Sequence, residues 1–337
     1  MSRVLVTGGA GYVGSHTSKA LSRAGLTPVV FDNLSGGRPD FVRWGPLERG
    51  DIMDAAALDA AIEHHHPTAV LHFAGRIEAG ESVLHPDVFY AVNVQGTLNV
   101  LAAMRRHSIR TLVFSSSAAV YGAPQHVPID ESAAIAPTSP YGHSKAMSET
   151  MIRDFAAAFG IRYIALRYFN AAGADEDAEL GESHHPETHA LPLAIAAARG
   201  GAPFRMHGTD YPTPDGTAIR DYVHVADLAD AHVAALRHLD SGGESQALNL
   251  GAEHGISVRR LVAAVTAAGG TAVPCIEGPR RAGDPPLLQA DSHRAREVLG
   301  WRAHRSSLDN IVKTAWRWHA SADGESKASA RQAGTPH

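Results

Sequence analysis

Residues 3–14, RVLVTGGAGYVG, join a short apolar run to a glycine-rich turn and then to the start of a helix. Gly8, Gly11 and Gly14 have the spacing that lets backbone approach a diphosphate closely, and the N-terminus of the following helix supplies positive potential. A glycine pattern alone is a weak signal, but the strand and the helix that it requires are both present here. The stretch therefore predicts the dinucleotide-binding turn of a Rossmann-type fold.

An acidic residue at the end of the next predicted strand indicates which dinucleotide binds. That strand, PVVFD, ends at Asp32, about 20 residues beyond the glycine turn, where a carboxylate accepts both ribose hydroxyls of an adenosine. The same carboxylate repels a 2′-phosphate, so NAD is favoured over NADP. The motif GDI places Asp51 and Ile52 beside the expected adenine.

The N-terminal half alternates between short β-branched runs and helical stretches. The runs at 3–8, 28–32, 69–75, 111–117 and 161–169 are typical of buried strands. Strands that alternate with helices form parallel sheets. We therefore predict the α/β class, as a Rossmann-type doubly wound parallel sheet with a smaller C-terminal α/β substrate-binding lobe.

The composition changes after the fifth predicted strand, where glycine, proline, histidine and acidic residues become frequent. We expect residues 1–170 to form the NAD-binding domain, with 216–250 returning to it. Residues 171–215 and 251–320 are expected to form the lobe. The small, polar tail at 322–337 is predicted to be disordered.

The overall composition argues against several classes of function. The 337 residues carry a net charge of -5 with histidine neutral, so no basic field points to nucleic acid. No apolar run approaches the roughly 18 residues of a membrane span. Cys275 is the only cysteine, and the first strand starts too early to leave room for a signal peptide. Both features favour a cytoplasmic protein.

Histidine is abundant, with 21 copies, which raises the question of a metal site. His64, His65 and His66 are consecutive at the expected exposed end of a helix. His184 and His185 lie in a charged loop. We find no set of residues with zinc-ligand spacing, so no metal site is predicted.

A tyrosine and a lysine stand four positions apart in SPYGHSK, residues 139–145. A proline opens this predicted helix, and residues i and i+4 share one helix face. Ser117 ends the strand TLVFSSS, and the carboxyl ends of strands in a doubly wound sheet face the ligand. A nearby ammonium favours the phenolate of a tyrosine, whose free pKa near 10 is high for a general base. Ser117, Tyr141 and Lys145 are therefore the predicted catalytic set.

Between about residues 3 and 320 the chain carries, in order, the motifs VTGGAGYVGSHT, DNLS, GDI, HFAG, NVQGTLNVL, FSSSAAVYG, SPYGHSK, LRYFNAAGA, IRDYVHVADLADAH, LNLG and RRAGD. In this order and density they resemble the extended short-chain dehydrogenase/reductase family, and within it the UDP-galactose (UDP-glucose) 4-epimerases. The resemblance implies epimerisation of a UDP-sugar through a transient 4-keto sugar, with one bound NAD and no net redox.

The same resemblance implies two sets of binding residues. The cofactor would contact Gly8, Gly11, Tyr12, Val13, Gly14, Asp32, Asn33, Asp51, Ile52, Phe73, Ala74, Asn93, Tyr141, Lys145 and Tyr168. The UDP-sugar would contact Ser117, Tyr141, Asn170, His207, Arg220, Arg281, Asp284 and Leu288.

Several alternatives stay open at this point. Ala118 and Ala119 stand where the 4,6-dehydratases of the family carry an Asp-Glu pair, and alanines cannot exchange protons, which disfavours dehydration. A UDP-xylose/UDP-arabinose 4-epimerase is the nearest alternative, because a hydrophobic pocket discriminates poorly against a missing group. Leu288 replaces the tyrosine of many hexose-specific members and leaves N-acetylhexosamines open. A non-catalytic NAD-sensing regulator is the alternative from another class.

The family pairs through two helices per subunit, which in this chain correspond to about 90–106 and 144–158. The resemblance therefore implies a homodimer.

Overall fold

The computed structural model describes residues 2–281 and 284–321. Its main feature is a seven-stranded parallel sheet in the order β10-β6-β5-β4-β1-β2-β3. This order is that of the doubly wound dinucleotide-binding fold, extended by one strand. The strands are β1 (Arg3–Thr7), β2 (Thr27–Asp32), β3 (Leu47–Arg49), β4 (Ala69–His72), β5 (Thr111–Ser117), β6 (Arg162–Tyr168) and β10 (Gln246–Leu250).

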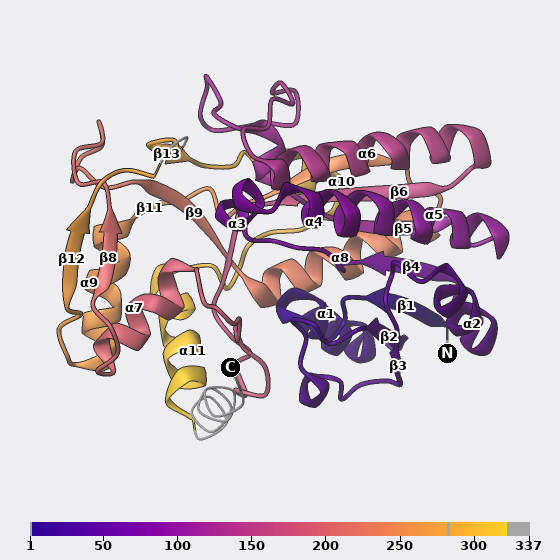
Figure 1. The fold of residues 1–337 in the computed structure, drawn as a ribbon, viewed down its shortest axis with the longest axis horizontal. Coiled ribbons are helices and arrows are strands. Elements are labelled where there is room, and N and C mark those ends of the chain that lie inside the picture. The colour runs from indigo at the N-terminus through magenta and orange to yellow at the C-terminus, as the bar shows by residue number, and fades with distance from the viewer. Residues whose placement is uncertain (1, 282–283, 322–337) are drawn as a thin grey trace.

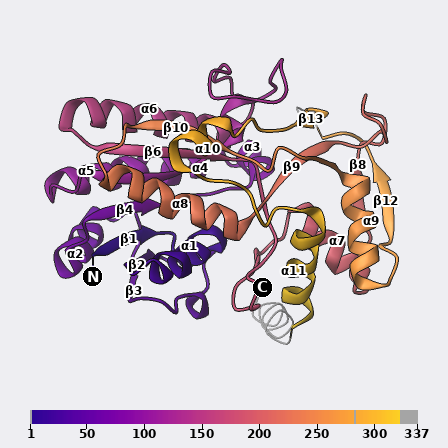
Figure 2. The ribbon, with the colours of Figure 1, turned by 180° about the vertical axis from the view of Figure 1, so that it is seen from behind.

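Helices cover both faces of this sheet (Figures 1 and 2). One face carries α1 (Tyr12–Arg23), α8 (Val225–Asp240) and α10 (His293–Leu299), and the other carries α2 (Ala55–His65), α5 (Gly96–Arg106) and α6 (Pro140–Phe159). Leu21 and Leu228 are buried on the first face, and Leu58 and Leu101 on the second. Apolar strands buried on both sides are what a parallel sheet requires, and the predicted fold class is confirmed.

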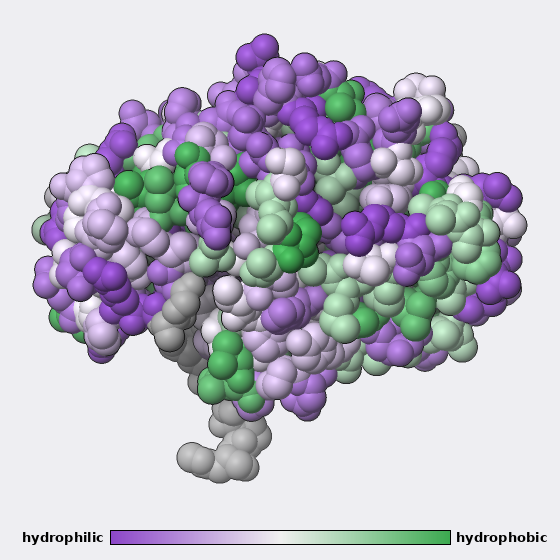
Figure 3. All heavy atoms as spheres, turned by 90° about the horizontal axis from the view of Figure 1, so that it is seen from above, coloured by the Kyte–Doolittle hydropathy of each residue, from purple (hydrophilic) through white to green (hydrophobic). Residues whose placement is uncertain are grey.

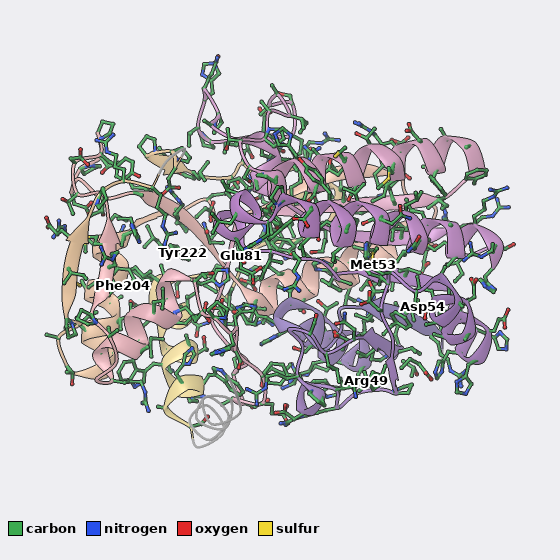
Figure 4. The ribbon with its side chains drawn as sticks, viewed as in Figure 1. Arg49, Met53, Asp54, Glu81, Phe204 and Tyr222 are labelled. Carbon is green, nitrogen blue, oxygen red and sulfur yellow. The ribbon has the colours of Figure 1, made fainter. Side chains whose placement is uncertain are left out.

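The lobe lies at one end of the long axis (Figure 1). Its larger sheet contains β7 (Asn170–Ala172), β9 (Ile219–His224), β11 (Gly255–Ser257) and β13 (Leu287–Leu288), while β8 (Phe204–His207) pairs with β12 (Cys275–Gly278). The helices α7 (Ala190–Ala198), α9 (Val258–Gly269) and α11 (Leu308–Ala320) pack together beside these strands. Phe204 and Tyr222, labelled in Figure 4, belong to the core of this lobe.

Short elements connect the larger ones. They are η1 (Pro39–Phe41), α3 (Ala79–Leu84), α4 (Pro86–Phe89), the π-helical η2 (Tyr90–Gln95) and η3 (Ala118–Tyr121). Within the described residues, no helix combines the length and apolarity needed to cross a membrane.

The segment 216–250 is shared between the two parts of the molecule. Its helix α8 packs on the main sheet and β10 joins that sheet, but β9 pairs with β7, β11 and β13 of the lobe. Neighbouring side chains of β9 point to opposite faces of the strand, so β9 can belong to both cores. Val223 is buried in the core beneath α8, and Tyr222 is buried in the core of the lobe. The segment 216–250 thus contributes α8 and β10 to the main sheet and β9 to the sheet of the lobe. The predicted disordered tail, 322–337, lies outside the described residues.

Candidate active site

The glycine turn leaves no room for side chains. Gly8 has a φ of 72°, and a Cβ there would lie 2.5 Å from the amide nitrogen of Ala74. A Cβ on Gly14 would lie 2.3 Å from the carbonyl oxygen of Gly8. Gly11 precedes α1 without a side-chain capping bond. The first N–H groups of the helix are thus available to an anionic ligand, and the turn is open to close approach.

Asp32 is held rigidly at the carboxyl end of β2. Its Oδ2 accepts the N–H of Ala10 at 3.0 Å, and its Oδ1 accepts the N–H of Leu34 at 2.8 Å. Burial raises the pKa of Asp32, and these two hydrogen bonds oppose the shift. Each oxygen keeps a further lone pair, so the carboxylate can accept two ribose hydroxyls. Beside it, Asn33 donates to Oδ2 of Asp51 at 2.9 Å and orients that second carboxylate.

Most of the predicted cofactor residues line one cavity of about 340 Å³, a size typical of small-molecule sites. The predicted residues on its wall are Gly8, Gly11, Tyr12, Val13, Gly14, Asp32, Asn33, Asp51, Ile52, Phe73, Ala74, Ser117, Tyr141, Lys145, Tyr168 and Asn170. A turn without Cβ atoms, a helix N-terminus without a cap and a carboxylate with spare lone pairs together fit NAD.

Helix α6 brings the tyrosine and the lysine to this cavity. Ser139 caps the helix by accepting the N–H of Gly142 at 3.2 Å, and Pro140 stands in the first turn, where the sequence predicts that the helix opens. Burial raises the pKa of Tyr141, a hydrogen bond with Ser117 lowers it, and the charge of Glu78 raises it again. The phenol therefore faces the hydroxyl at the end of β5.

Lys145 is buried, and its Nζ donates to the carbonyl oxygen of Ser115 at 2.8 Å. The ammonium lies 5.0 Å from the centre of the Phe114 ring. Burial lowers the pKa of Lys145 to about 8, against the opposing charge of Glu149. The lysine is a cation at neutral pH that loses its proton in mildly alkaline solution.

Two further predicted residues shape this region in different ways. Tyr168 shares a short hydrogen bond with Ser115, and burial raises its pKa. Asn93 is buried behind the cavity wall. Its Oδ1 accepts the N–H of Arg76, and its Nδ2 donates to the carbonyl oxygen of Arg76 and, at 2.9 Å, to the hydroxyl of Ser144. Asn93 therefore positions a wall segment and the first turn of α6, and it is not itself on the wall.

The predicted UDP-binding residues gather in the lobe. Arg220 on β9 donates to Oδ1 of Asp284 at 2.5 Å, and its side chain is only 11% exposed. Burial lowers the pKa of His207 at the end of β8. The charge of Arg281 lowers it further, and the charge of Asp284 raises it. Leu288 pairs with Arg220 across β13 and β9. The remaining member, Asn170, donates to the carbonyl of Asp221 at 3.0 Å from the cavity wall.

The wall of the cavity also contains residues that the sequence analysis did not predict there. Glu182, His184 and His189 line its wall, although His184 was expected to be an ordinary loop residue. The charges of the histidines hold the pKa of Glu182 below its usual range against its burial, and the carboxylates raise the pKa of His189. The alternation of acids and histidines in GESHHPETH is the signal that could have found them.

The histidine triplet also differs from expectation. His65 is buried at the end of α2, and its Nε2 lies 2.6 Å from Oε1 of Glu48. His64 is exposed, and His66 ends the helix in the left-handed conformation. The expected exposed helix end is wrong for His65, because Glu48 on β3 gives its imidazole a partner.

Comparison with known proteins shows where this architecture recurs. The NAD dependent epimerase/dehydratase family matches residues 4–251. The chain is 50% identical over 318 residues to a UDP-glucose 4-epimerase from Rhizobium leguminosarum bv. trifolii, covering 94% of this chain and 97% of that protein. It superposes on the Brucella ovis UDP-glucose 4-epimerase solved with NAD with a TM-score of 0.92 and 49% identity, over 94% of this chain and 98% of that one.

A third relative was solved with a nucleotide sugar. It is the UDP-glucose 4-epimerase from Stenotrophomonas maltophila, solved with NAD and formylated UDP-arabinopyranose. The TM-score is 0.91 at 37% identity, over 98% of this chain and 100% of that one. These likenesses extend over the nucleotide domain and the lobe together. The chain belongs to the NAD dependent epimerase/dehydratase family.

Proposed function

We propose that this protein interconverts UDP-galactose and UDP-glucose by epimerisation at C4 of the sugar, with NAD as its cofactor. The observation that carries the proposal is the meeting of Ser117, Tyr141 and Lys145 on the wall of the cavity that also contains the glycine turn and Asp32. Relatives that match nearly the whole chain are named UDP-glucose 4-epimerases, which supports the same activity.

The side chains divide the chemistry among them. Tyr141 as phenolate takes the proton of the sugar 4-hydroxyl and later returns it. Ser117, on the same cavity wall, donates to the reacting oxygen. NAD, when bound, supplies an acceptor and then a donor for the C4 hydrogen with its electron pair. Arg220 and Asn170 hold the diphosphate while the sugar ring turns over between the two steps.

The direct test is an assay of the purified protein with UDP-galactose and no added NAD. Formation of UDP-glucose would establish epimerisation with a retained cofactor. Conversion of UDP-xylose in preference to UDP-galactose would favour the pentose alternative, for which the Stenotrophomonas complex with a UDP-arabinopyranose derivative is the supporting observation. Bound NAD without turnover of any UDP-sugar would leave the NAD-sensing regulator.

We expect Lys145→Met to change the pH profile of the reaction. Tyr141 must lose its proton for turnover, which favours high pH, whereas the Lys145 ammonium persists only below its pKa of about 8. The wild-type kcat should therefore stop rising above about pH 8, because loss of the ammonium offsets the gain of phenolate, whereas the kcat of the variant should keep rising. Its rising limb should move to higher pH, with kcat at pH 7 about 10-fold lower, because one pKa unit on the base corresponds to a factor of ten.

Steady-state rates between pH 6 and 10, measured with Lys313→Met as an exposed control, check this result. A Lys145→Met profile parallel to the wild type would show that the ammonium does not tune Tyr141.

Arg220→Ala is expected to weaken substrate binding more than turnover. The guanidinium anchors the diphosphate in ground state and transition state alike, so its loss raises KM and leaves kcat nearly unchanged. A charge-assisted hydrogen bond contributes about 1.5 kcal/mol or more, which corresponds to a rise in KM of about 10-fold. Steady-state kinetics with UDP-galactose measure the changes in KM and kcat separately. Arg237→Ala, an exposed residue of α8, makes the same charge change as a control.

We also propose that the protein is a cytoplasmic homodimer. Apolar side chains stay exposed on α3, α4, η2 and α6, the region of the two helices that pair in the family: Val83, Leu84, Val88, Tyr90, Met147 and Phe159. Figure 3 shows apolar patches among hydrophilic side chains on the face seen from above. Contiguous exposed apolar surface marks an interaction site. Sedimentation of the wild type and of Met147→Asp tests this, since a wild-type monomer would contradict it.

A further inference from the structure

Four potential metal ligands converge in the segment that leads into α7. Nδ1 of His189 lies 2.8 Å from Oε1 of Glu182 and 3.0 Å from Oε1 of Glu187. Nδ1 of His184 lies 3.2 Å from Oε1 of Glu182 and 3.8 Å from Oε2 of Glu187. All four residues place a ligand atom within 4.8 Å of one another. They form a compact set of two imidazoles and two carboxylates, here called the Glu182–His189 cluster.

The distances within the cluster match those between the ligands of a four-coordinate metal. Zinc binds imidazole nitrogen at about 2.0–2.1 Å and carboxylate oxygen at about 2.0–2.2 Å, almost always as a tetrahedron in structural sites. Neighbouring ligand atoms of such a tetrahedron are about 3.3–3.5 Å apart, from the same bond lengths. The four nitrogen–oxygen separations, from 2.8 to 3.8 Å, bracket this value, with Glu187 contributing Oε1 to one of them and Oε2 to another. One ion can therefore contact all four side chains after small adjustments.

His184 gives independent evidence for a missing ligand. Its Nδ1 is buried and has no hydrogen-bond partner among the described residues, although a carboxylate oxygen of Glu182 lies 3.2 Å away. Buried polar atoms in native proteins are nearly always satisfied, and an exception calls for a bound ion or water.

Charge favours the same conclusion. The carboxylate of Glu182 is 5% exposed, and the side chain of Glu187 is 19% exposed. Two carboxylates this close and this shielded repel each other and need a compensating positive charge. Protonated histidines can supply that charge, and so can one divalent ion bound by neutral imidazoles. The ion would also give Nδ1 of His184 a partner, which it lacks among the described residues.

Two other clusters in the described part of the chain are weaker candidates. The carboxylates of Asp175, Asp177 and Glu179 already share the ammonium of Lys19, which lies 2.8 Å from Asp175. In the cluster of Glu48, His64 and His65, both imidazoles approach the same carboxylate oxygen, and the His64 side chain is 71% exposed.

We propose that Glu182, His184, Glu187 and His189 bind one divalent transition-metal ion, with Zn²⁺ preferred. Imidazole and carboxylate together suit zinc, and a site closed by four protein ligands is structural and not catalytic. The site holds part of the cavity wall against the glycine turn, because the ring of His184 packs edge-on against Tyr12, with centroids 6.2 Å apart. The backbone carbonyl of Glu182 is in turn tied to Trp318 of α11. This site does not depend on the epimerase activity.

The test uses protein without an affinity tag, stripped with a chelator, reconstituted with Zn²⁺ and dialysed. Metal content per chain is measured by mass spectrometry, and thermal unfolding is followed with and without Zn²⁺. We expect about one zinc per chain and a higher Tm for the reconstituted wild type, since a ligand that binds only the native state stabilises it. His185→Gln changes the exposed neighbouring histidine and should match the wild type in both measurements.

His184→Gln should lower zinc affinity by more than about 100-fold, because even partners beyond the ligands change it about 10- to 100-fold. It should also lose the zinc-dependent rise in Tm. The replacement breaks no hydrogen bond at Nδ1, so the variant should fold, and Glu187→Gln repeats the test on the opposite side. Intense visible absorption of bound Co²⁺ would support tetrahedral coordination.

The proposal is overturned if the reconstituted wild type holds no more zinc than His184→Gln. It is overturned equally if zinc is lost in His64→Gln and kept in His184→Gln. In either case the Glu182–His189 cluster is a proton-linked network of ion pairs.

Discussion

Tyr141→Phe is expected to lower kcat for the UDP-galactose reaction by about 10³-fold, a loss of ~4 kcal/mol of transition-state stabilisation. The phenylalanine keeps the ring that packs edge-on against Phe89, with centroids 6.5 Å apart, and removes only the oxygen that takes and returns the proton. Binding of NAD and of UDP should therefore stay near the wild-type level, while the chemical step nearly stops.

The measurement is single-turnover conversion of UDP-galactose, with UDP binding followed separately by calorimetry. Tyr163→Phe removes a phenol from β6 outside the cavity and serves as a matched control. A kcat within a few-fold of the wild type would exclude Tyr141 as the base. A parallel loss of UDP binding would indicate instead that the substitution disturbs the site.

Gly14→Ala is expected to remove retained NAD and to lower turnover at limiting NAD by at least about 100-fold. The new methyl group would lie 2.3 Å from the carbonyl oxygen of Gly8, and because that oxygen is a backbone atom, only a shift of the whole turn relieves the contact. Overpacking of this kind costs about 1–3 kcal/mol, and the shift also displaces the N–H groups that face the diphosphate.

NAD released on denaturation, quantified per chain, measures the effect directly. Gly80→Ala is the matched control, because a Cβ there meets nothing within 4 Å. Equal NAD content in Gly14→Ala and in the wild type would mean that the turn does not approach the cofactor as closely as proposed. Saturating NAD should restore part of the activity of Gly14→Ala, because the catalytic side chains come from β5 and α6.

Local patterns account for the parts of the molecule that could be predicted. The glycine turn, Asp32 at the end of β2 and the cap of α6 each follow from residues close together in sequence. The fold class followed as well, because β-branched runs alternate with helices along the nucleotide domain. Strand β3 was not predicted, since its three residues, LER, carry no apolar run. Its place depends on the neighbouring strand β2 and on Glu48, which meets His65.

The sequence by itself determined the doubly wound sheet and the glycine turn, and it predicted the roles of Tyr141, Lys145 and Ser117, because those signals depend on short-range spacing. Only the tertiary structure decided which partner each buried charge has. It placed Lys145 against the carbonyl of Ser115, and it turned Glu182 and His184 toward each other beside the glycine turn. Burial makes such contacts strong and directional, and no local pattern specifies them, since they depend on how distant segments pack.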